Sequence, residues 1–150
     1  MRASMQRGVV GMRIWIRGVL VLIVFALAAC ASGGSKMDAL QSAQYDYSAA
    51  IRWNDFEGAW SMVDPEFRKE HPISELEFER YKQVKVSRYN VLASQGSAKD
   101  MHARQEVQSD VINEHTQVQR SIRYTEVWRY DEAAKTWLVT SGLPDFWAGM

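Results

Sequence analysis

Residues 100–112 read DMHARQEVQSDVI and residues 117–130 read QVQRSIRYTEVWRY. Apolar side chains fall on alternate positions of both stretches: Met101, Ala103, Val107 and Val111 in the first, and Val118, Ile122, Tyr124, Trp128 and Tyr130 in the second. The positions between them are mostly polar, for example His102, Arg104, Glu106, Gln108, Arg123 and Thr125. Because successive side chains of a strand point to opposite faces, this alternation predicts two strands with one buried face and one wet face. These strands decide the fold class.

A turn at Glu114-His115 would pair the two strands antiparallel. The predicted neighbours are Val111 with Val118, Val107 with Ile122, Met101 with Trp128, and Glu106 with Arg123. After a turn over residues 131–135, a last strand at 136–142 would bring Trp137 beside Tyr130 and Val139 beside Trp128. Such pairs of side chains are the unit that stabilises a sheet, and they set its register.

A further strand begins upstream, at Val84, where the hydrophobic period changes from helical to two. Alternation over residues 84–92 predicts this strand, and Gln95-Gly96-Ser97 is predicted to turn the chain. The sheet would then have four strands.

Helical patterns precede the strands. Apolar residues with helical spacing predict a helix over residues 37–53. Asn54, with Glu57 three residues later, predicts the N-cap of a short helix that ends before Asp64-Pro65. Ser74 and Glu77 repeat the capping pattern and predict a helix over about 75–83. About three helices packed on a curved, mainly antiparallel four-stranded sheet make an α+β domain.

Residues 1–29 have the composition of a secretory signal. They hold four arginines and no acidic residue, and Gly18 to Ala29 is an uninterrupted apolar run of 12 residues. A helix that spans a bilayer needs about 20 residues, so a cleaved signal fits better than a permanent anchor. The notable feature is the end of the run, Leu27-Ala28-Ala29-Cys30, which contains the single cysteine of the chain.

This ending resembles the lipobox of bacterial lipoproteins. The resemblance implies a signal peptide over residues 1–29, a lipid on Cys30 and a flexible tether within residues 30–36, ahead of a domain over 37–150. Ala31 follows the cysteine where inner-membrane lipoproteins tend to have Asp, which implies an outer-membrane location with the domain facing the periplasm. Translation could start at Met1 or at Met12.

Charge and composition exclude several classes of protein. The chain has 18 Lys+Arg and 18 Asp+Glu in 150 residues, so it lacks the basic surplus of nucleic-acid-binding proteins. From Cys30 onward there are 14 basic and 18 acidic residues, a formal charge of −4. One cysteine excludes an intramolecular disulfide and a thiolate zinc site. His71, His102 and His115 lack the spacing of metal ligands, so we expect no metal and no cofactor.

The order of the elements and the placement of aromatic residues resemble the nuclear-transport-factor-2-like superfamily. The residues that carry the resemblance are Trp53 to Glu57, Asp64 to Arg68, Glu126 to Tyr130, Trp137 to Val139 and Gly142 to Pro144. This superfamily has a cone-shaped fold and includes ketosteroid isomerase and scytalone dehydratase. The resemblance implies a pocket between the helices and the concave sheet. The predicted pocket residues are Tyr47, Trp60, Met101, Gln105, Tyr124, Glu126, Trp128 and Trp137.

Glu126 is the unusual residue on the apolar strand face. Burial would raise its pKa toward the range of a general base, and the isomerase resemblance suggests Tyr47 as a donor to an oxyanion. The alternative is a half-solvated Glu126 paired with Arg52 or Arg120. The chain does not match the catalytic Asp, His and Tyr motifs of the superfamily, which favours a protein without catalytic activity.

The sequence therefore predicts a lipid-anchored periplasmic module that binds a small apolar ligand or an envelope protein and does not bind nucleic acid. The alternative is a small lyase or isomerase that uses Glu126 and Tyr47. The polar outer face of the sheet predicts a monomer or a weak dimer. Residues 143–147, with Phe146 and Trp147, are expected to fold back over the mouth of the pocket.

Overall fold

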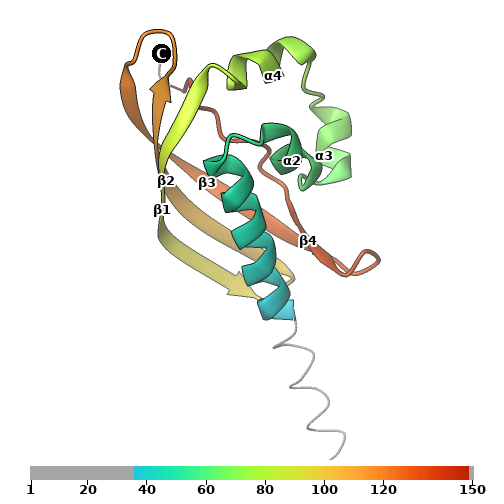
Figure 1. The fold of residues 1–150 in the computed structure, drawn as a ribbon. Helices are drawn as coiled ribbons and strands as arrows, with labels where there is room; N and C mark the ends of the chain where they lie inside the picture. Colours follow the sequence, from blue (N-terminus) through green and yellow to red (C-terminus); the bar gives the residue numbers. More distant parts are fainter. Residues whose placement is uncertain (1–35, 149–150) are drawn as a thin grey trace, which may run out of the picture. The chain divides into compact units, whose positions relative to one another are not determined.

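The computed structural model describes residues 36–148. A helix over residues 36–52 is followed by α2 (Phe56–Ser61), α3 (Pro65–Glu70) and α4 (Glu75–Tyr81). Four strands come next, β1 (Val84–Ser97), β2 (His102–Asn113), β3 (Gln119–Asp131) and β4 (Thr136–Val139). The described residues from Met37 onward form one compact unit (Figure 1). The predicted α+β class is confirmed.

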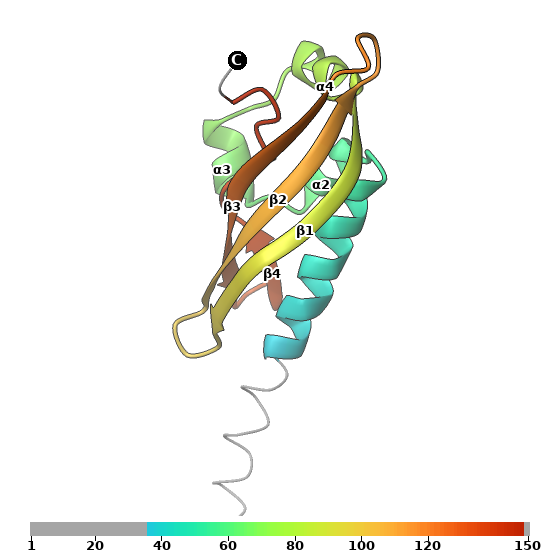
Figure 2. The same cartoon turned by 90° about the vertical axis from the view of Figure 1, so that its left-hand side faces the viewer.

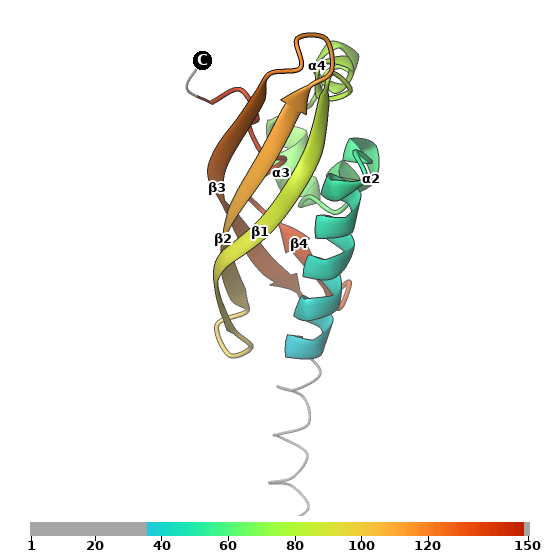
Figure 3. The ribbon, with the colours of Figure 1, turned by 60° about the vertical axis from the view of Figure 1, so that its left-hand side comes forward.

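The strands form one antiparallel sheet in the order β1-β2-β3-β4, which does not close on itself. Strands β1, β2 and β3 are long, with 14, 12 and 13 residues, and Figures 2 and 3 show that they curve strongly with the helices on one side. The side chains at alternate positions of β2, from Ala103 to Val111, are buried against these helices. His102, Arg104 and Glu106 on the other face are exposed, as the alternation predicted.

The helix over 36–52 covers the concave face of the sheet with its apolar stripe. Leu40, Ala43, Tyr47 and Ile51 are buried along that stripe, so the prediction of a helix over 37–53 is correct to within one residue. They join a core that includes Phe56, Val111, Trp128 and Trp137. Burial of this stripe stabilises the helix, because packing rather than propensity holds helices of this length.

The cap of α2 differs from the prediction. Asp55 is its N-cap, and its carboxylate accepts a hydrogen bond from the N–H of Gly58 at 2.9 Å. Asn54 instead has a left-handed backbone with φ 60, and its side chain bonds the carbonyl oxygen of Val84 and the N–H of Val86. The side-chain amide of Asn54 therefore bonds a distant strand, which local sequence does not reveal.

Helix α3 was missed because Asp64-Pro65 reads as a stop. The same two residues also begin α3. The carboxylate of Asp64 accepts a hydrogen bond from the N–H of Glu66 at 2.9 Å, and Pro65 lies in the first turn of the helix. Proline is favoured there because its missing N–H has no helical partner to lose. The capping box of Ser74 and Glu77 at α4 is confirmed, and this helix ends at Tyr81.

Two predictions about β1 and β2 are wrong. Residues 95–97 do not turn the chain, because β1 continues to Ser97 and the turn follows at 98–101. Met101 lies in that turn with φ 56, so Ala103 rather than Met101 is the neighbour of Trp128.

The register of β2 and β3 differs from the prediction by two residues. Observed pairs are Val107 with Tyr124, Glu106 with Thr125, and Ser109 with Ile122. The loop is longer than predicted: the N–H of Asn113 bonds the carbonyl oxygen of Val118 at 3.0 Å, and Gln117 has φ 58. An even shift keeps each side chain on its predicted face. Val118, however, leaves the sheet and is 55% exposed.

The pairing of β3 with β4 follows the prediction. Trp137 lies opposite Tyr130 and Val139 lies opposite Trp128. The strand itself is shorter than the predicted 136–142 and ends at Val139.

Candidate functional site

Glu126 lies inside the domain, on the concave face of β3. The residue is 1% exposed and faces Gln105 of β2 across the ladder. The shift in register produces this pair, since the predicted pairing of Met101 with Trp128 would have placed Ala103 beside Glu126. The alternative of a half-solvated Glu126 paired with Arg52 or Arg120 is therefore wrong.

A tyrosine that was not among the predicted pocket residues holds the carboxylate. The hydroxyl of Tyr89 donates to Oε1 of Glu126 at 2.6 Å. Tyr89 lies in β1, which has irregularities between Val86 and Arg88 and between Val91 and Ala93. Alternation along β1 does not predict which face a residue takes after such a bulge. A weak signal existed, because Tyr89 is the one aromatic residue among residues 84–97.

The second oxygen of the carboxylate is less well satisfied. Glu126 Oε2 and the indole nitrogen of Trp128 are both buried, and neither has a hydrogen-bond partner among residues 36–148. The indole N–H is nevertheless close enough to lower the pKa of the Glu126 carboxyl, as is the hydroxyl of Tyr89. Desolvation outweighs both effects and raises this pKa to about 7. A buried carboxylate without a cation partner shifts in this direction because burial penalises the charged form.

Three tyrosines lie around the carboxylate. Burial, followed by the charge of Glu126, raises the pKa of Tyr47, Tyr89 and Tyr124 above the ordinary value. All three therefore stay protonated as hydrogen-bond donors at neutral pH. None of them supplies a positive charge that would keep Glu126 ionised.

Tyr47 does not face Glu126 as a free donor. Its hydroxyl donates to the carbonyl oxygen of Gly142 at 3.1 Å, and its ring packs edge-on against Trp128 with 5.5 Å between the centroids. Gly142 has φ 73, and a Cβ there would lie 2.8 Å from Phe67. Tyr47 thus anchors the turn that leads into the C-terminal segment.

The structure brings together only part of the predicted pocket. The concave interior contains five of these residues: Tyr47, Gln105, Tyr124, Glu126 and Trp128. Here Gln105 bonds Ser94 at 3.4 Å and the hydroxyl of Tyr124 bonds that of Ser109 at 3.1 Å. Trp60 and Trp137 border separate surface hollows, and Met101 lies in a turn. Side chains fill this interior, and Glu126 does not line the surface hollows described here.

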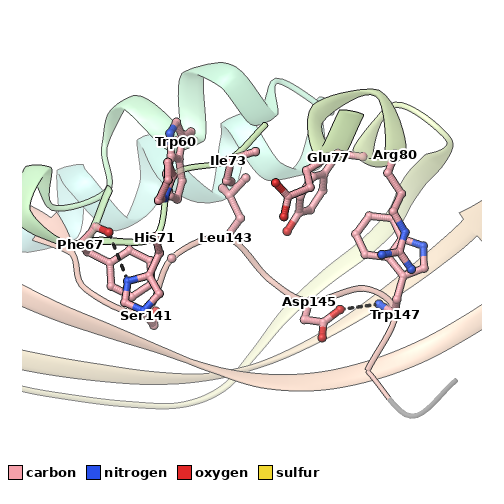
Figure 4. Close-up of a pocket in the computed structure, with 13 residues that line it drawn as sticks. Trp60, Phe67, His71, Ile73, Glu77, Arg80, Ser141, Leu143, Asp145 and Trp147 are labelled. Atoms are coloured by element: carbon pink, nitrogen blue, oxygen red, sulfur yellow. Dashed lines mark hydrogen bonds between the residues drawn. The ribbon is translucent and has the colours of Figure 1, made fainter. Parts of the chain in front are cut away.

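An open groove lies instead between the short helices and the C-terminal segment. It has a volume of about 370 Å³ (Figure 4). Its lining combines aromatic and aliphatic side chains with a few charged ones, notably Trp60, Phe67, Ile73, Glu77, Arg80, Leu143, Asp145 and Trp147. We call this the aromatic groove. Small-molecule sites are usually concave and combine aromatic or aliphatic side chains with a few polar groups, and this groove has both kinds of side chain.

The C-terminal segment folds back, as predicted, and builds one wall of this groove. Phe146 is 1% exposed and packs against Phe56 and Tyr81. Trp147 contacts Tyr81 edge-on, and the guanidinium of Arg80 lies 4.2 Å from its ring centroid. The phenol of Tyr81 donates to the carbonyl oxygen of Pro144 at 3.0 Å. The segment is therefore part of the domain.

A partly buried ion pair ties α3 to the sheet. Arg129 of β3 bonds the carboxylate of Asp64 through Nε at 3.0 Å and through a second guanidinium nitrogen at 2.5 Å. Burial alone would raise the pKa of Asp64, but the bonds from Arg129 and from the N–H of Glu66 lower it below the ordinary value. The pair is structural because Asp64 is also the N-cap of α3.

Within residues 36–148 no group of His, Cys, Asp and Glu side chains could hold a metal ion. Among the same residues no helix has the length and apolar character needed to cross a membrane. Cys30 and the rest of the lipobox lie outside the described residues, as does the predicted signal peptide.

Comparisons with known proteins show a shared fold. No family model matches the chain, and no curated protein matches it. One similar structure is the solution structure of a SEC-C motif containing protein from Rhodopseudomonas palustris, with TM-score 0.51, 16% identity, and coverage of 65% of this chain and 72% of that one. A second is the crystal structure of a SEC-C motif containing protein from Psychrobacter arcticus, with TM-score 0.49, 14% identity, and coverage of 69% and 56%. The chain therefore shares the α+β fold of the Rhodopseudomonas protein.

Proposed function

We propose that this chain is a lipid-anchored periplasmic protein of the bacterial outer membrane, whose folded domain is a non-enzymatic binding module. The domain is proposed to be a nuclear-transport-factor-2-like cone. The observation that carries the proposal is the contrast between a filled interior and an open aromatic groove. Glu126 is enclosed by Tyr89 and by the core, whereas the groove is accessible and lined by aromatic side chains beside charged ones. The groove is the proposed site for a small apolar ligand.

The anchor rests on the sequence Leu27-Ala28-Ala29-Cys30. Each buried methylene of an acyl chain contributes about 0.8 kcal/mol, so several chains on Cys30 would hold the protein at the membrane. The test is to label cells with an alkyne fatty acid and to fractionate their membranes. The full chain should carry the label and separate with outer membranes. The Cys30→Ser variant should do neither, and a labelled variant would contradict the proposal.

A second candidate function is a lyase or isomerase that uses Glu126. One observation favours it: the pKa of this carboxyl is about 7, which suits a general base at neutral pH. The hydroxyl of Tyr47, which would have to donate to substrate, bonds Gly142 instead. Binding in the aromatic groove and chemistry at Glu126 would depend on different residues.

A neutral fluorescent probe, N-phenyl-1-naphthylamine, separates the two functions. Trp60→Ala removes one wall of the groove and should weaken binding of the probe at least tenfold. Leu76→Ala is the matched control, because Leu76 is 79% exposed on α4 and does not line the groove. Glu126→Gln should leave binding unchanged. Loss of binding in Glu126→Gln, with none in Trp60→Ala, would favour the interior site.

A further inference from the structure

One edge of the sheet is closed by the chain itself. The outer edge of β4 pairs with the segment after α2, where Val63 forms a parallel bridge to Val139. The N–H of Asp64 bonds the carbonyl oxygen of Val139 at 2.8 Å, and the N–H of Val139 bonds that of Met62 at 3.1 Å. These bonds satisfy backbone groups that would otherwise be open to another strand.

The opposite edge, at β1, is closed only where it begins. The side-chain amide of Asn54 spans Val84 and Val86 like a short strand, with bonds of 3.0 and 3.2 Å. Beyond this point, no backbone group of residues 87–97 bonds anything outside the β1 and β2 ladder among residues 36–148. Residues 90–96 are exposed, and Figure 3 shows β1 at the edge of the sheet, beside β2. The structure therefore offers about ten residues of open edge.

Apolar side chains accompany this open edge. Val91 is 42% exposed and Leu92 is 44% exposed, because the irregularity between Val91 and Ala93 breaks the alternation. Trp53, at the end of the first helix, is 80% exposed. It borders a hollow of about 210 Å³ together with residues 86–89 of β1. A partner strand at this open edge would also cover the exposed apolar side chains that accompany it.

The charge of this edge is opposite to that of the domain. Strand β1 contains Lys85 and Arg88 and no acidic residue, and Arg52 borders the hollow beside Trp53. The chain from Cys30 onward has a formal charge of −4. Arg88 has an ion pair, 3.4 Å from Asp110, but Arg52 and Lys85 take part in none within the described residues. A negatively charged partner would complement them.

From these observations we infer that the open edge of β1, over residues 87–97, binds an extended acidic segment of another protein as an added strand. The backbone of the segment would pair with β1, and its apolar side chains would cover Val91, Leu92 and Trp53. Its carboxylates would lie near Arg52 and Lys85. Strand addition of this kind draws affinity from main-chain hydrogen bonds and specificity from alternate side chains. The surface shares no residue with the aromatic groove.

Site-specific photo-cross-linking of the full chain in its host tests the inference. Leu92 is replaced by p-benzoylphenylalanine, and the cross-linked peptide is sequenced by mass spectrometry. We expect a segment that contains Asp or Glu and alternating apolar residues. The same photoreactive residue at Val118, which is exposed on the far hairpin, is the matched control and should not capture this segment.

Charge reversal supplies the second measurement. Arg52→Glu with Lys85→Glu should reduce the cross-linking yield at least tenfold, whereas Lys69→Glu on α3 should leave it unchanged. Unchanged circular dichroism and melting temperature would show that the variants fold. Cross-links to a second copy of the chain, to phospholipid, to a basic or helical segment, or to nothing would each overturn the inference. The aromatic groove of these variants should still bind N-phenyl-1-naphthylamine. If it does while the cross-linking result fails, only the inference about the β1 edge is overturned, and the proposed function of the groove stands.

Discussion

Tyr89 of β1 and Glu126 of β3 are joined across the intervening strand β2, with 2.6 Å between the phenolic oxygen and Oε1. The bond links the open edge strand to the centre of the sheet. It is also a hydrogen bond to a carboxylate whose pKa lies near 7, so its strength depends on pH. Substitutions of Tyr89 or Glu126 should therefore change how the unfolding free energy of the domain depends on pH.

Glu126 should make the domain less stable as pH rises. Its pKa is about 7 in the folded domain, against an ordinary value of 4.5. The folded state then binds the proton more tightly, so the contribution is fully present below pH 4.5 and is lost as pH rises through 7. The shift corresponds to about 3 kcal/mol of unfolding free energy. Urea denaturation at pH 5 and pH 8 measures it.

The variant Glu126→Gln should remove this dependence and be more stable than the parent at pH 8. Glu106→Gln on the exposed face is the control, and its unfolding free energy should change with pH as that of the parent does. If the parent domain has the same unfolding free energy at pH 5 and pH 8, the pKa of the Glu126 carboxyl is not raised by burial, and the prediction is wrong.

Tyr89→Phe should destabilise the domain more at pH 8 than at pH 5. The phenol donates to an ionised carboxylate at the higher pH, and hydrogen bonds to charged groups contribute about 1.5–3 kcal/mol. With a protonated Glu126, the loss should fall to about 1 kcal/mol. Tyr45→Phe, at a site that is 70% exposed, should change neither value. Equal losses at both pH values would show that the bond does not depend on ionisation.

Asp64→Asn should lower the unfolding free energy by about 1–2 kcal/mol at pH 7. It removes the negative charge that pairs with Arg129 and that interacts favourably with the N-terminus of α3, while Asn keeps the capping hydrogen bond. The pKa of Asp64 is below its ordinary value, so its contribution is present at neutral pH and is lost as pH falls through that lowered pKa. The parent and the variant should therefore converge in acid. Asp38→Asn, at an exposed site, is the control, and thermal melts at pH 7 and pH 3 provide the comparison.

Phe146→Ala should cost about 3–5 kcal/mol, the range for removing a buried aromatic ring. Phe146 is 1% exposed between Phe56 and Tyr81. A chain that stops after Gly142 should lose at least as much. Leu76→Ala should be nearly neutral in the same chemical denaturation. A truncated domain of unchanged stability would mean that residues 143–148 dock on a partner instead.

Local patterns were sufficient for much of this fold. Alternation assigned the buried and wet faces of β2 and β3, the capping box of Ser74 and Glu77 marked the start of α4, and the helix over 36–52 followed from its apolar stripe. The sequence also singled out Glu126, because one carboxylate on an apolar face is conspicuous. These features depend on neighbours within a few residues, so the sequence by itself determines them.

Only the tertiary structure decided the rest. The loop after Asn113 moved the register by two residues and placed Gln105 opposite Glu126. Bulges turned Tyr89 toward that carboxylate and left Val91 and Leu92 exposed. Asn54 bonds a strand that lies 30 residues away along the chain. Loop length, bulges and long-range hydrogen bonds arise from how the whole chain packs. Alternative registers, bulges and hydrogen-bond partners differ by only a few kcal/mol in the free energy of the folded chain, and a local pattern of residues does not predict differences of that size.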